Sequence, residues 1–443
     1  MDTNAEANDR LVESLLAVNQ LQFTLPPQLG IATSRKHVVM FPQQASYTGA
    51  STVIIDSQTG STYVDPFNSY FVFKVNIVVT GGGGQWTWGS GSVANIIDRI
   101  IVRSRSGKEL SRVESFPLWA KYSQLYGKGR DWCQTIGRSQ GYPNYNIAPV
   151  VDGVTPANTR YGDGYTSGQT YSFILPLALI PCFAPLNGKL LPPQLMEGLR
   201  LEITLANPSA VVTSHTNVAI TSVDSTTVTP ELHYDCFTIA DQFARKIIDM
   251  SARSGLKLLY EEAFHTLVVS STSTINFDIK KACSKGLRLM LIPRNSAVVG
   301  VVNNDPVASS QYSFLTQQIN IGSEYIPNQK LTTGVDSKSF LESYYQTMFA
   351  HSALDGSTCI SPLQYLGGPT GQATKTEYNS AMTCFTLNKS NVTGLNGFVI
   401  NNSRALVVNL TSDVAVVASL RLDAFLVHLR SLDVMVSNVS VAD

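Results

Sequence analysis

The sequence predicts an all-β fold of two similar antiparallel sandwiches in tandem, with short helices in the loops. Three observations lead to this prediction. Apolar and polar residues alternate with a period of two from about residue 70 almost to the C-terminus. Long connections rich in Gly, Ser, Thr, Asn and Pro, such as residues 80–91, 141–170 and 356–380, separate the alternating runs. The order of motifs in the first half of the chain recurs in the second half.

Each alternating run places one apolar face toward a core. In the second half these runs cover residues 275–279, 287–291 and 420–426. One buried face per strand is typical of antiparallel sheets that pack face to face, so the runs predict sandwiches. In the first half, the apolar faces are Phe71, Phe73, Val75, Ile77 and Val79, then Leu199, Leu201, Ile203 and Leu205.

An amphipathic arm is predicted at the N-terminus. Asn8 or Asp9 can cap a short helix that places Leu11, Leu15 and Val18 on one stripe. The alternative is a segment that has no fixed structure in the free subunit. The apolar stripe makes these three residues candidate interface residues.

Two further helices are predicted inside the alternating regions, and residues 240–255 are predicted to connect the two halves with a helical turn. Ser115 can cap the first helix, and Asp336 or Ser337 can cap the second. Their apolar faces are Leu118, Trp119, Tyr122 and Tyr126 in the first helix, and Phe340, Leu341, Tyr344 and Met348 in the second.

Each of these helices follows a strand and turn of similar pattern. IIDRIIVRSRSGKEL precedes ESFPLWAKYSQLYG, and LTQQINIGSEYIPNQKL precedes DSKSFLESYYQTMFA. Matching Ile101 with Ile319 and Asp235 with Asp423 gives copies that span 134 and 104 residues, so the order is kept while loop lengths differ. Chance likeness between two β-rich stretches is the alternative, and the shared helix argues against it. Each copy has room for about eight short strands and a helix, which is the content of one jelly-roll sandwich.

This repeat predicts four parts of the chain. Residues 1–37 form the N-terminal arm, 38–240 the first jelly roll, 241–256 the connection and 257–443 the second jelly roll. A period near 200 residues is far longer than the roughly 20 to 50 residues of solenoid or propeller repeats. Two similar domains in tandem therefore fit the pattern better than a repeat array.

Composition narrows the class of function. The 443 residues include 44% hydrophobic and only 14% charged residues, and 32 Lys and Arg balance 32 Asp and Glu. A general nucleic-acid binder needs a basic excess, and a disordered chain needs few apolar groups, so both classes are excluded. A surface poor in charged residues is expected where neighbouring subunits cover it, because interfaces are depleted in Lys and Glu.

The compartment is predicted from cysteines and from the N-terminal residues. Six cysteines are widely spaced without a CxxC motif, so we expect free thiols in a reducing compartment. The first residues are acidic and lack the basic and apolar regions of a signal peptide. We therefore expect synthesis on the cytosolic side of the cell without a signal peptide, and no transmembrane span.

The sequence carries no pattern that indicates catalysis. Gly81–Gly84 lack the GK[ST] ending of a phosphate loop, and neither GxSxG nor HExxH occurs. His233 and Cys236 lie close in sequence but on opposite faces of a strand, which disfavours a zinc site. Asp235 and Asp423 hold matching places in the two copies, which duplication explains with a structural or interface role. We expect no enzyme, no catalytic residue, no cofactor and no metal.

Two tryptophans in the glycine-rich loop are the other candidate interface residues. Trp86 and Trp88 can anchor a neighbouring subunit or stack on a sugar, because a flat aromatic ring offers contact area at low entropy cost. We favour the interface anchor.

The repeated order of strand, GKEL turn, aromatic helix, long loop and paired C-terminal strands resembles the double jelly-roll major capsid proteins of tailless double-stranded DNA viruses. The resemblance covers about residues 38–432 and depends on this architecture. The stretch VANIIDRIIVRSRSGKELSRVESF is most similar to the smaller polinton-like and virophage proteins, in a lineage that also includes adenoviruses and nucleocytoplasmic large DNA viruses.

The resemblance implies a structural protein of the virion capsid. It implies a homotrimer that forms a capsomer with a pseudo-sixfold outline, tiles an icosahedral shell, and contacts neighbouring capsomers and minor capsid or vertex proteins. The N-terminal arm is acidic, so we expect no sequence-specific binding of nucleic acid; contact with an internal membrane is the hypothesis that its apolar stripe motivates. The alternatives are a glycan-binding or receptor-binding tandem sandwich, such as a fibre or lectin, and a minor vertex protein.

Overall fold

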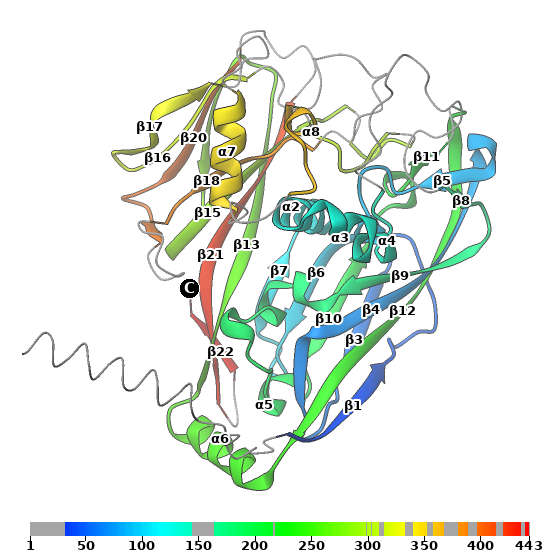
Figure 1. Ribbon diagram of the computed structural model, residues 1–443, viewed down its shortest axis with the longest axis vertical. Coiled ribbons are helices and arrows are strands. Elements are labelled where there is room, and N and C mark those ends of the chain that lie inside the picture. The colour runs from blue at the N-terminus through cyan, green and yellow to red at the C-terminus, as the bar shows by residue number, and fades with distance from the viewer. Residues whose placement is uncertain are drawn as a thin grey trace, which may run out of the picture.

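The computed structural model describes residues 32–143, 164–215, 218–297, 299–302, 304–309, 314–332, 340–351, 358–366, 380–388, 397–412, 420–435 and 439–442. All ladders between its named strands are antiparallel. The predicted all-β class is confirmed, with two sandwiches and a few short helices (Figure 1).

The first sandwich has one sheet in the order β1-β12-β4-β9 and a second in the order β3-β10-β6-β7. Its strands are β1 (Ala32–Met40), β3 (Thr52–Asp56), β4 (Tyr63–Gly81), β6 (Ile97–Arg103), β7 (Glu109–Val113), β9 (Thr170–Pro176), β10 (Arg200–Leu205) and β12 (Ile220–Ile239). The short β2 (Tyr47–Thr48) pairs with β12, and β5 (Gln85–Thr87), β8 (Tyr165–Thr166) and β11 (Thr213–Ser214) form a small third sheet.

The second sandwich repeats this arrangement with sheets in the orders β13-β21-β15-β18 and β14-β20-β16-β17. Its strands are β13 (Leu256–Ser270), β14 (Thr274–Ile279), β15 (Cys283–Asn295), β16 (Phe314–Ile321), β17 (Glu324–Thr332), β18 (Thr383–Thr386), β20 (Leu406–Ser412) and β21 (Leu420–Val434). The short β19 (Phe398–Ile400) pairs with β15, and β22 (Val439–Ala442) pairs with β21.

Both sandwiches have the pairing of a jelly roll. When the eight main strands of each copy are numbered in chain order, the first pairs with the eighth, the second with the seventh, the third with the sixth and the fourth with the fifth. This is the pairing of a long antiparallel hairpin that has been rolled into two sheets. The same order in both halves confirms the tandem jelly rolls that the sequence predicts.

Helices occupy the connections. The α-helices are α2 (Phe116–Gly127), α3 (Arg130–Gln134), α4 (Ile136–Ser139), α5 (Pro193–Met196), α6 (Asp241–Arg253), α7 (Phe340–Ala350) and α8 (Pro362–Leu366). The 3-10 helices are η1 (Gly82–Gly84), η2 (Val93–Ile96), η3 (Leu177–Leu179), η4 (Pro181–Phe183), η5 (Leu186–Gly188) and η6 (Pro208–Ala210). In each copy one helix, α2 or α7, follows the fifth main strand, as predicted from the repeat.

Three details of the predicted elements differ in the structure. Ser115 precedes α2 in a left-handed conformation with φ of 49° and makes no side-chain capping bond. Pro117 lies in the first turn of α2, where its fixed φ favours the start of a helix. Strand β1 begins at Ala32, inside the segment that the sequence assigns to the arm, because β1 pairs with β12 from Ala32 onward. The predicted helical turn of the connection is the longer helix α6.

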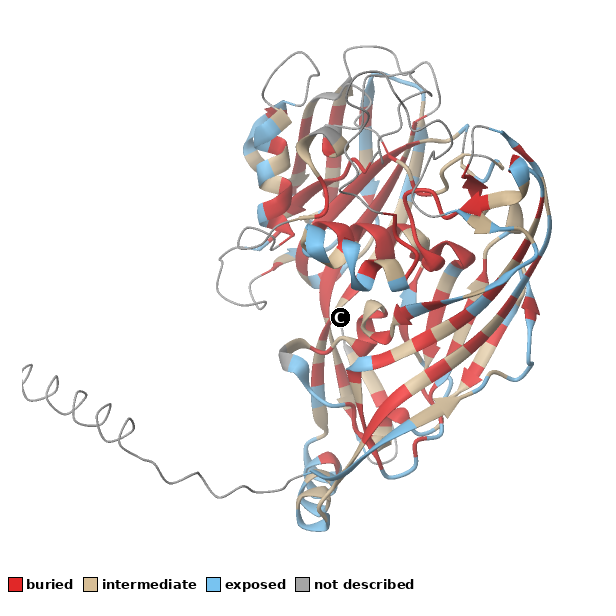
Figure 2. Cartoon of the chain, turned by 45° about the vertical axis from the view of Figure 1, so that its right-hand side comes forward, coloured by how far each residue is buried: buried red, intermediate tan, exposed pale blue. Residues whose placement is uncertain are grey.

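The apolar residues of the alternating runs are the buried residues of the strands. The faces predicted for β4 and β10 are buried, and Leu420, Leu422, Ala424 and Leu426 of β21 are fully buried in the core between the two sheets of the second sandwich. Figure 2 shows buried residues along the sheets and mostly exposed or half-buried residues on α6 at the lower end of the molecule. A second apolar core fills the first sandwich and continues into the contact between the two sandwiches.

Candidate functional site

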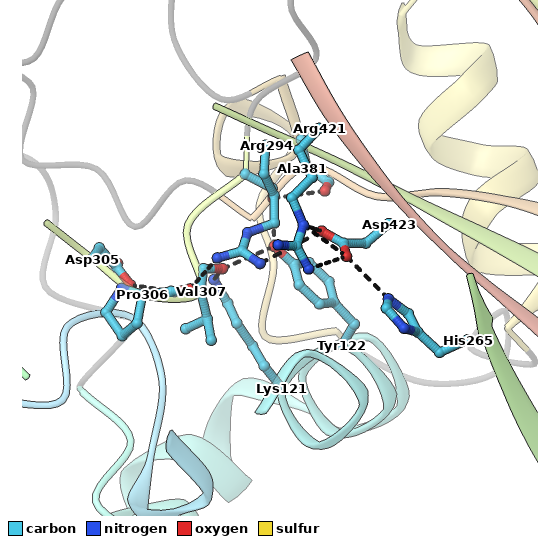
Figure 3. Close-up of polar contacts among 11 residues, drawn as sticks. Lys121, Tyr122, His265, Arg294, Asp305, Pro306, Val307, Ala381, Arg421 and Asp423 are labelled. Carbon is cyan, nitrogen blue, oxygen red and sulfur yellow. Dashed lines mark hydrogen bonds and ion pairs between the residues drawn. The ribbon is translucent and has the colours of Figure 1, made fainter. Parts of the chain in front are cut away.

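A buried network of hydrogen bonds and ion pairs lies where the two jelly rolls meet. The outer face of the sheet β13-β21-β15-β18 packs against α2 and neighbouring parts of the first jelly roll, so Met290, Ile292 and Phe425 belong to the same apolar core as Trp119 of α2. The rings of Trp119 and Phe425 lie 6.1 Å apart. Figure 3 shows the polar groups that this contact encloses.

Asp423 on β21 is the centre of this polar network and is fully buried. Its carboxylate accepts hydrogen bonds from Arg421 Nη2 at 2.9 Å and Arg421 Nε at 3.0 Å. His265 Nε2 lies 3.0 Å from Oδ1, and Arg294 Nη1 lies 3.5 Å from Oδ2 (Figure 3). Burial by itself raises the pKa of Asp423, but the hydrogen bonds from His265 and Arg421 and the charge of Arg294 lower it to about 2.

A buried lysine joins the helix α2 to the second jelly roll. Lys121 Nζ donates to Ser90 Oγ at 2.7 Å and to the carbonyl of Val307 at 2.9 Å. Burial lowers the pKa of Lys121 to about 7. Tyr122, the next residue, donates to the same carbonyl at 3.2 Å and contacts Ser309.

Asp305 completes this link between the two jelly rolls. Its carboxylate accepts from the backbone N–H of Ser90 at 2.9 Å and from that of Val307 at 3.1 Å. Gly89 precedes Ser90 with φ of 68°, and a Cβ at this position would lie 2.9 Å from Asp305 Cγ. Both the backbone conformation and the close approach therefore require glycine here.

A second group of contacts lies between β7 and β13. Tyr260 donates to the carbonyl of Leu110 at 2.6 Å, and Glu262 Oε1 accepts from Ser111 Oγ and from the backbone N–H of Arg112, both at 3.1 Å. Burial raises the pKa of Glu262 to about 7, because the site penalises a charged carboxylate more than these bonds favour it.

A disulfide also connects the two jelly rolls. Cys133 on α3 is bonded to Cys359, 226 residues further along the chain. The expectation of free thiols is therefore wrong for this pair, because sequence spacing does not show that α3 lies beside residues 358–360 in the folded chain. The other cysteines of the described residues, Cys182, Cys236, Cys283 and Cys384, form no disulfide and are buried.

The two matched aspartates lie on the eighth main strand of each copy, at equivalent places in the ladders. Asp235 pairs in register with His37 and is bound by Arg35, two residues earlier on β1. Asp423 pairs in register with Leu267 and is bound by His265, two residues earlier on β13. Both strands lie inside their sheets, β12 between β1 and β4 and β21 between β13 and β15. Ion pairing across the ladder fits the structural role that duplication predicts.

The two predicted tryptophan anchors are not on the surface. Trp86 and Trp88 are fully buried, with their rings 4.9 Å apart and packed against Tyr165 and Phe173. The glycine run forms η1, which turns the chain from β4 into β5 and directs these side chains inward. Neither ring offers a face to a sugar or a neighbouring subunit, which corrects the sequence interpretation. Leu11, Leu15 and Val18 lie outside the described residues.

The outer face of the sheet β1-β12-β4-β9 carries a polar cluster that no sequence pattern predicts. His37 Nε2 lies 2.7 Å from His233 Nδ1, and the ring of Tyr70 stacks on His233 at 5.1 Å. Matching parity on paired strands could have revealed it, had the pairing of β1 with β12 been known.

The described part of the chain contains no group of three or more His, Cys, Asp or Glu residues that could hold a metal ion. None of its helices is long and apolar enough to cross a membrane. The arrangement of the polar groups is that of a structural junction: charges are paired and buried between two domains, and each is held by hydrogen bonds.

Comparison with known proteins reveals similarity at the level of structure. No protein-family model matches the sequence. No curated protein matches it either. Among solved structures, the chain is similar to PBCV-1 VP54 as fitted into the virophage Sputnik, with a TM-score of 0.61 and 11% identity, over 95% of this chain and 99% of that one.

Two further solved structures give the same result. The Faustovirus major capsid protein has a TM-score of 0.59 at 8% identity and is matched over 95% of this chain and 94% of its own. The mavirus major capsid protein has a TM-score of 0.55 at 9% identity, over 95% of this chain and 92% of its own. The match spans nearly the whole of each chain, so it includes both jelly rolls and their relative placement. The chain therefore has the double jelly-roll fold of viral major capsid proteins.

Proposed function

We propose that this chain is a major capsid protein, and that three copies associate into a capsomer with a pseudo-sixfold outline that tiles an icosahedral shell. The observation that carries the proposal is the duplication of a complete jelly roll within one chain. Three such chains supply six nearly equivalent sandwiches, which can fill a hexagonal block. The likeness to the Faustovirus and mavirus major capsid proteins supports the same conclusion.

Composition and the junction support a role in assembly. With 14% charged residues and a formal net charge of zero, the chain can form large subunit contacts without removing many charges from water. The buried network around Asp423 and Lys121 holds the two jelly rolls in one relative orientation, which a tile must keep in every copy. The role is one of shape and association.

The finer partners belong to the same proposal. In the virion the capsomer contacts neighbouring capsomers and minor capsid or vertex proteins, and the N-terminal arm reaches an internal membrane. The domain division proposed is a first jelly roll that ends at residue 240, a connection at 241–256 and a second jelly roll from 257. Deletion of residues 1–22 tests the arm: virions that assemble unchanged without it contradict its proposed role.

The experiment that tests the main proposal is the solution mass of the purified chain by light scattering, followed by negative-stain imaging of the same fraction. A trimer of 48.1 kDa chains, about 144 kDa, with a hexagonal outline is the expected result. A monomer, or a dimer without this outline, contradicts it and would favour a search for glycan ligands.

A further inference from the structure

Helix α6, which connects the two jelly rolls, is amphipathic but largely uncovered (Figure 2). Nine of its 13 residues are exposed, and only Ser251 is buried, where its hydroxyl donates to the carbonyl of Val434 at 3.1 Å. Neither apolar core of the described residues includes a residue of α6 or has an apolar side chain of α6 packed against it. An amphipathic helix that joins no core indicates a surface that another segment covers.

Three apolar side chains form a stripe along this helix, which we call the α6 stripe. Phe243 and Ile247 are half-buried, and Met250 is 55% exposed. Their spacings of four and three residues place them on one side of the helix, because residues three and four apart are neighbours on a helix surface. Ala252, which is exposed, lies on the opposite side. The α6 stripe therefore offers a second helix an apolar surface to pack on.

Residues 1–31, which lie outside the described residues, join the fold beside this stripe. Ala32, the first residue of β1, pairs in register with Ile239, and α6 begins two residues later at Asp241. Figure 1 shows the start of β1 beside α6 at the lower end of the molecule. The N-terminal segment of the chain is therefore attached next to α6.

The length of this segment suits a contact with α6. The 13 residues 19–31 separate Val18, the last residue of the predicted apolar stripe of the arm, from β1. Such a chain spans about 20 Å on average when flexible and about 43 Å when fully extended. Helix α6 is itself about 20 Å long, so the arm can reach all of it. A tether of this length gives a local concentration in the millimolar range, which populates even a weak contact.

The arm also has the chemistry to cover the α6 stripe. Leu11, Leu15 and Val18, which we call the arm stripe, have the same spacings of four and three residues. Two helices with apolar stripes of equal length bury both stripes when they pack together. Residues 1–20 contain four acidic residues and one basic residue, and residues 241–257 contain four basic and two acidic residues. The two segments therefore carry opposite net charges, which favour their approach.

We propose that the arm stripe docks on the α6 stripe of the same chain, as a contact between two short helices. The inference goes beyond the proposed capsid function, because it concerns the chain before assembly and needs no second copy. A docked arm cannot present its stripe to a membrane at the same time. Release of the arm from α6 must therefore precede the membrane contact proposed above.

Disulfide trapping tests the contact in the full-length chain. The test variant combines Leu15→Cys with Ile247→Cys, at the middle of the two stripes, so the pair can meet in either helix orientation. The control variant combines Leu15→Cys with Ala252→Cys, on the opposite side of α6. With oxidised glutathione as the oxidant, the test pair should form a disulfide within one chain at least about tenfold faster than the control pair. All six native cysteines are buried, which keeps background oxidation low.

Trypsin cleavage after Arg10 provides an independent measurement, because Arg10 is the only Lys or Arg among residues 1–31. Arg10 directly precedes the arm stripe, so a docked arm resists cleavage, which follows the population of the open state. Met250→Asp places a charge in the α6 stripe and should speed the release of residues 1–10 at least about threefold. Ala252→Asp adds the same charge near the same end of α6, on the opposite side, and should leave the rate unchanged.

The results separate this contact from the capsid proposal. Equal disulfide rates in the two cysteine variants, disulfides only between chains, or an Arg10 cleavage rate that Met250→Asp does not change would overturn docking within the chain. These results leave the capsid proposal intact, because it depends on the solution mass and outline of the wild type. A monomeric wild type that passes both tests contradicts the capsid proposal but supports the docked arm.

Discussion

Asp423 and Asp235 allow a comparison of one ion pair in two environments, because they hold equivalent positions in the two jelly rolls. Replacing Asp423 with Asn keeps the shape of the side chain but removes its charge, and leaves Arg294, whose side chain is 6% exposed, without its ion-pair partner. Removing one partner of a buried pair typically costs about 3–5 kcal/mol. We expect a loss of this size in the free energy of unfolding.

The matched control is Asp235→Asn. Its partner Arg35 is 63% exposed and can turn into water when the carboxylate is lost, so we expect a loss of at most about 1 kcal/mol. The measurement is urea unfolding of both variants and the wild type, followed by far-UV circular dichroism at pH 7. If the two substitutions destabilise the chain equally, burial does not decide the strength of these pairs and the reasoning is wrong.

The pH dependence gives this prediction a second test. The folded pKa of Asp423, about 2, lies below its ordinary value of 3.8, so the stabilisation is present above the ordinary value and is lost as the pH falls through 2. The difference between Asp423→Asn and the wild type should therefore shrink below about pH 4. A difference that stays constant down to pH 2 would show that the charge of Asp423 is not its source.

Three further predictions follow from the interior of the chain. Burial raises the pKa of Glu262 from 4.5 to about 7, so the free energy of unfolding of the wild type should fall as the pH rises between these two values. In urea unfolding, Glu262→Gln should be as stable as the wild type below pH 4.5 and more stable above pH 7, by up to about 3 kcal/mol. A wild-type advantage at pH 8 would contradict this. Cys133→Ser should lower the free energy of unfolding by about 2–5 kcal/mol, and a reductant should lower the stability of the wild type but not that of the variant. A wild type whose stability does not change with reductant would contradict the disulfide between Cys133 and Cys359. Trp88→Ala should lower the free energy of unfolding by about 3–5 kcal/mol, as expected for a core residue, in thermal or urea unfolding. Unchanged stability would indicate that Trp88 lies on the surface.

The helices and loops show where local patterns fail. The sequence predicts α2 from an apolar stripe and a capping serine, and the helix forms although Ser115 does not cap it, because the stripe is buried on both sides by the two jelly rolls. The glycine-rich connection around Trp86 and Trp88 predicts a surface loop, yet β5 belongs to a small sheet with β8 and β11, and both tryptophans are buried. Contacts with distant segments decide these cases.

The sequence by itself determined the all-β class, the buried face of strands such as β4 and β10, and the duplication, because the period-two alternation and the order of motifs are local and need no knowledge of neighbours. The tertiary structure alone decided which strands pair, that Cys133 meets Cys359, and that Asp423 is buried while Asp235 keeps an exposed partner. The physical reason is that alternation specifies which side of a strand is apolar, but not which distant surface covers it. The same limit explains why α2 and α7, similar in sequence pattern, differ in burial: only the assembled chain places the second jelly roll over one of them.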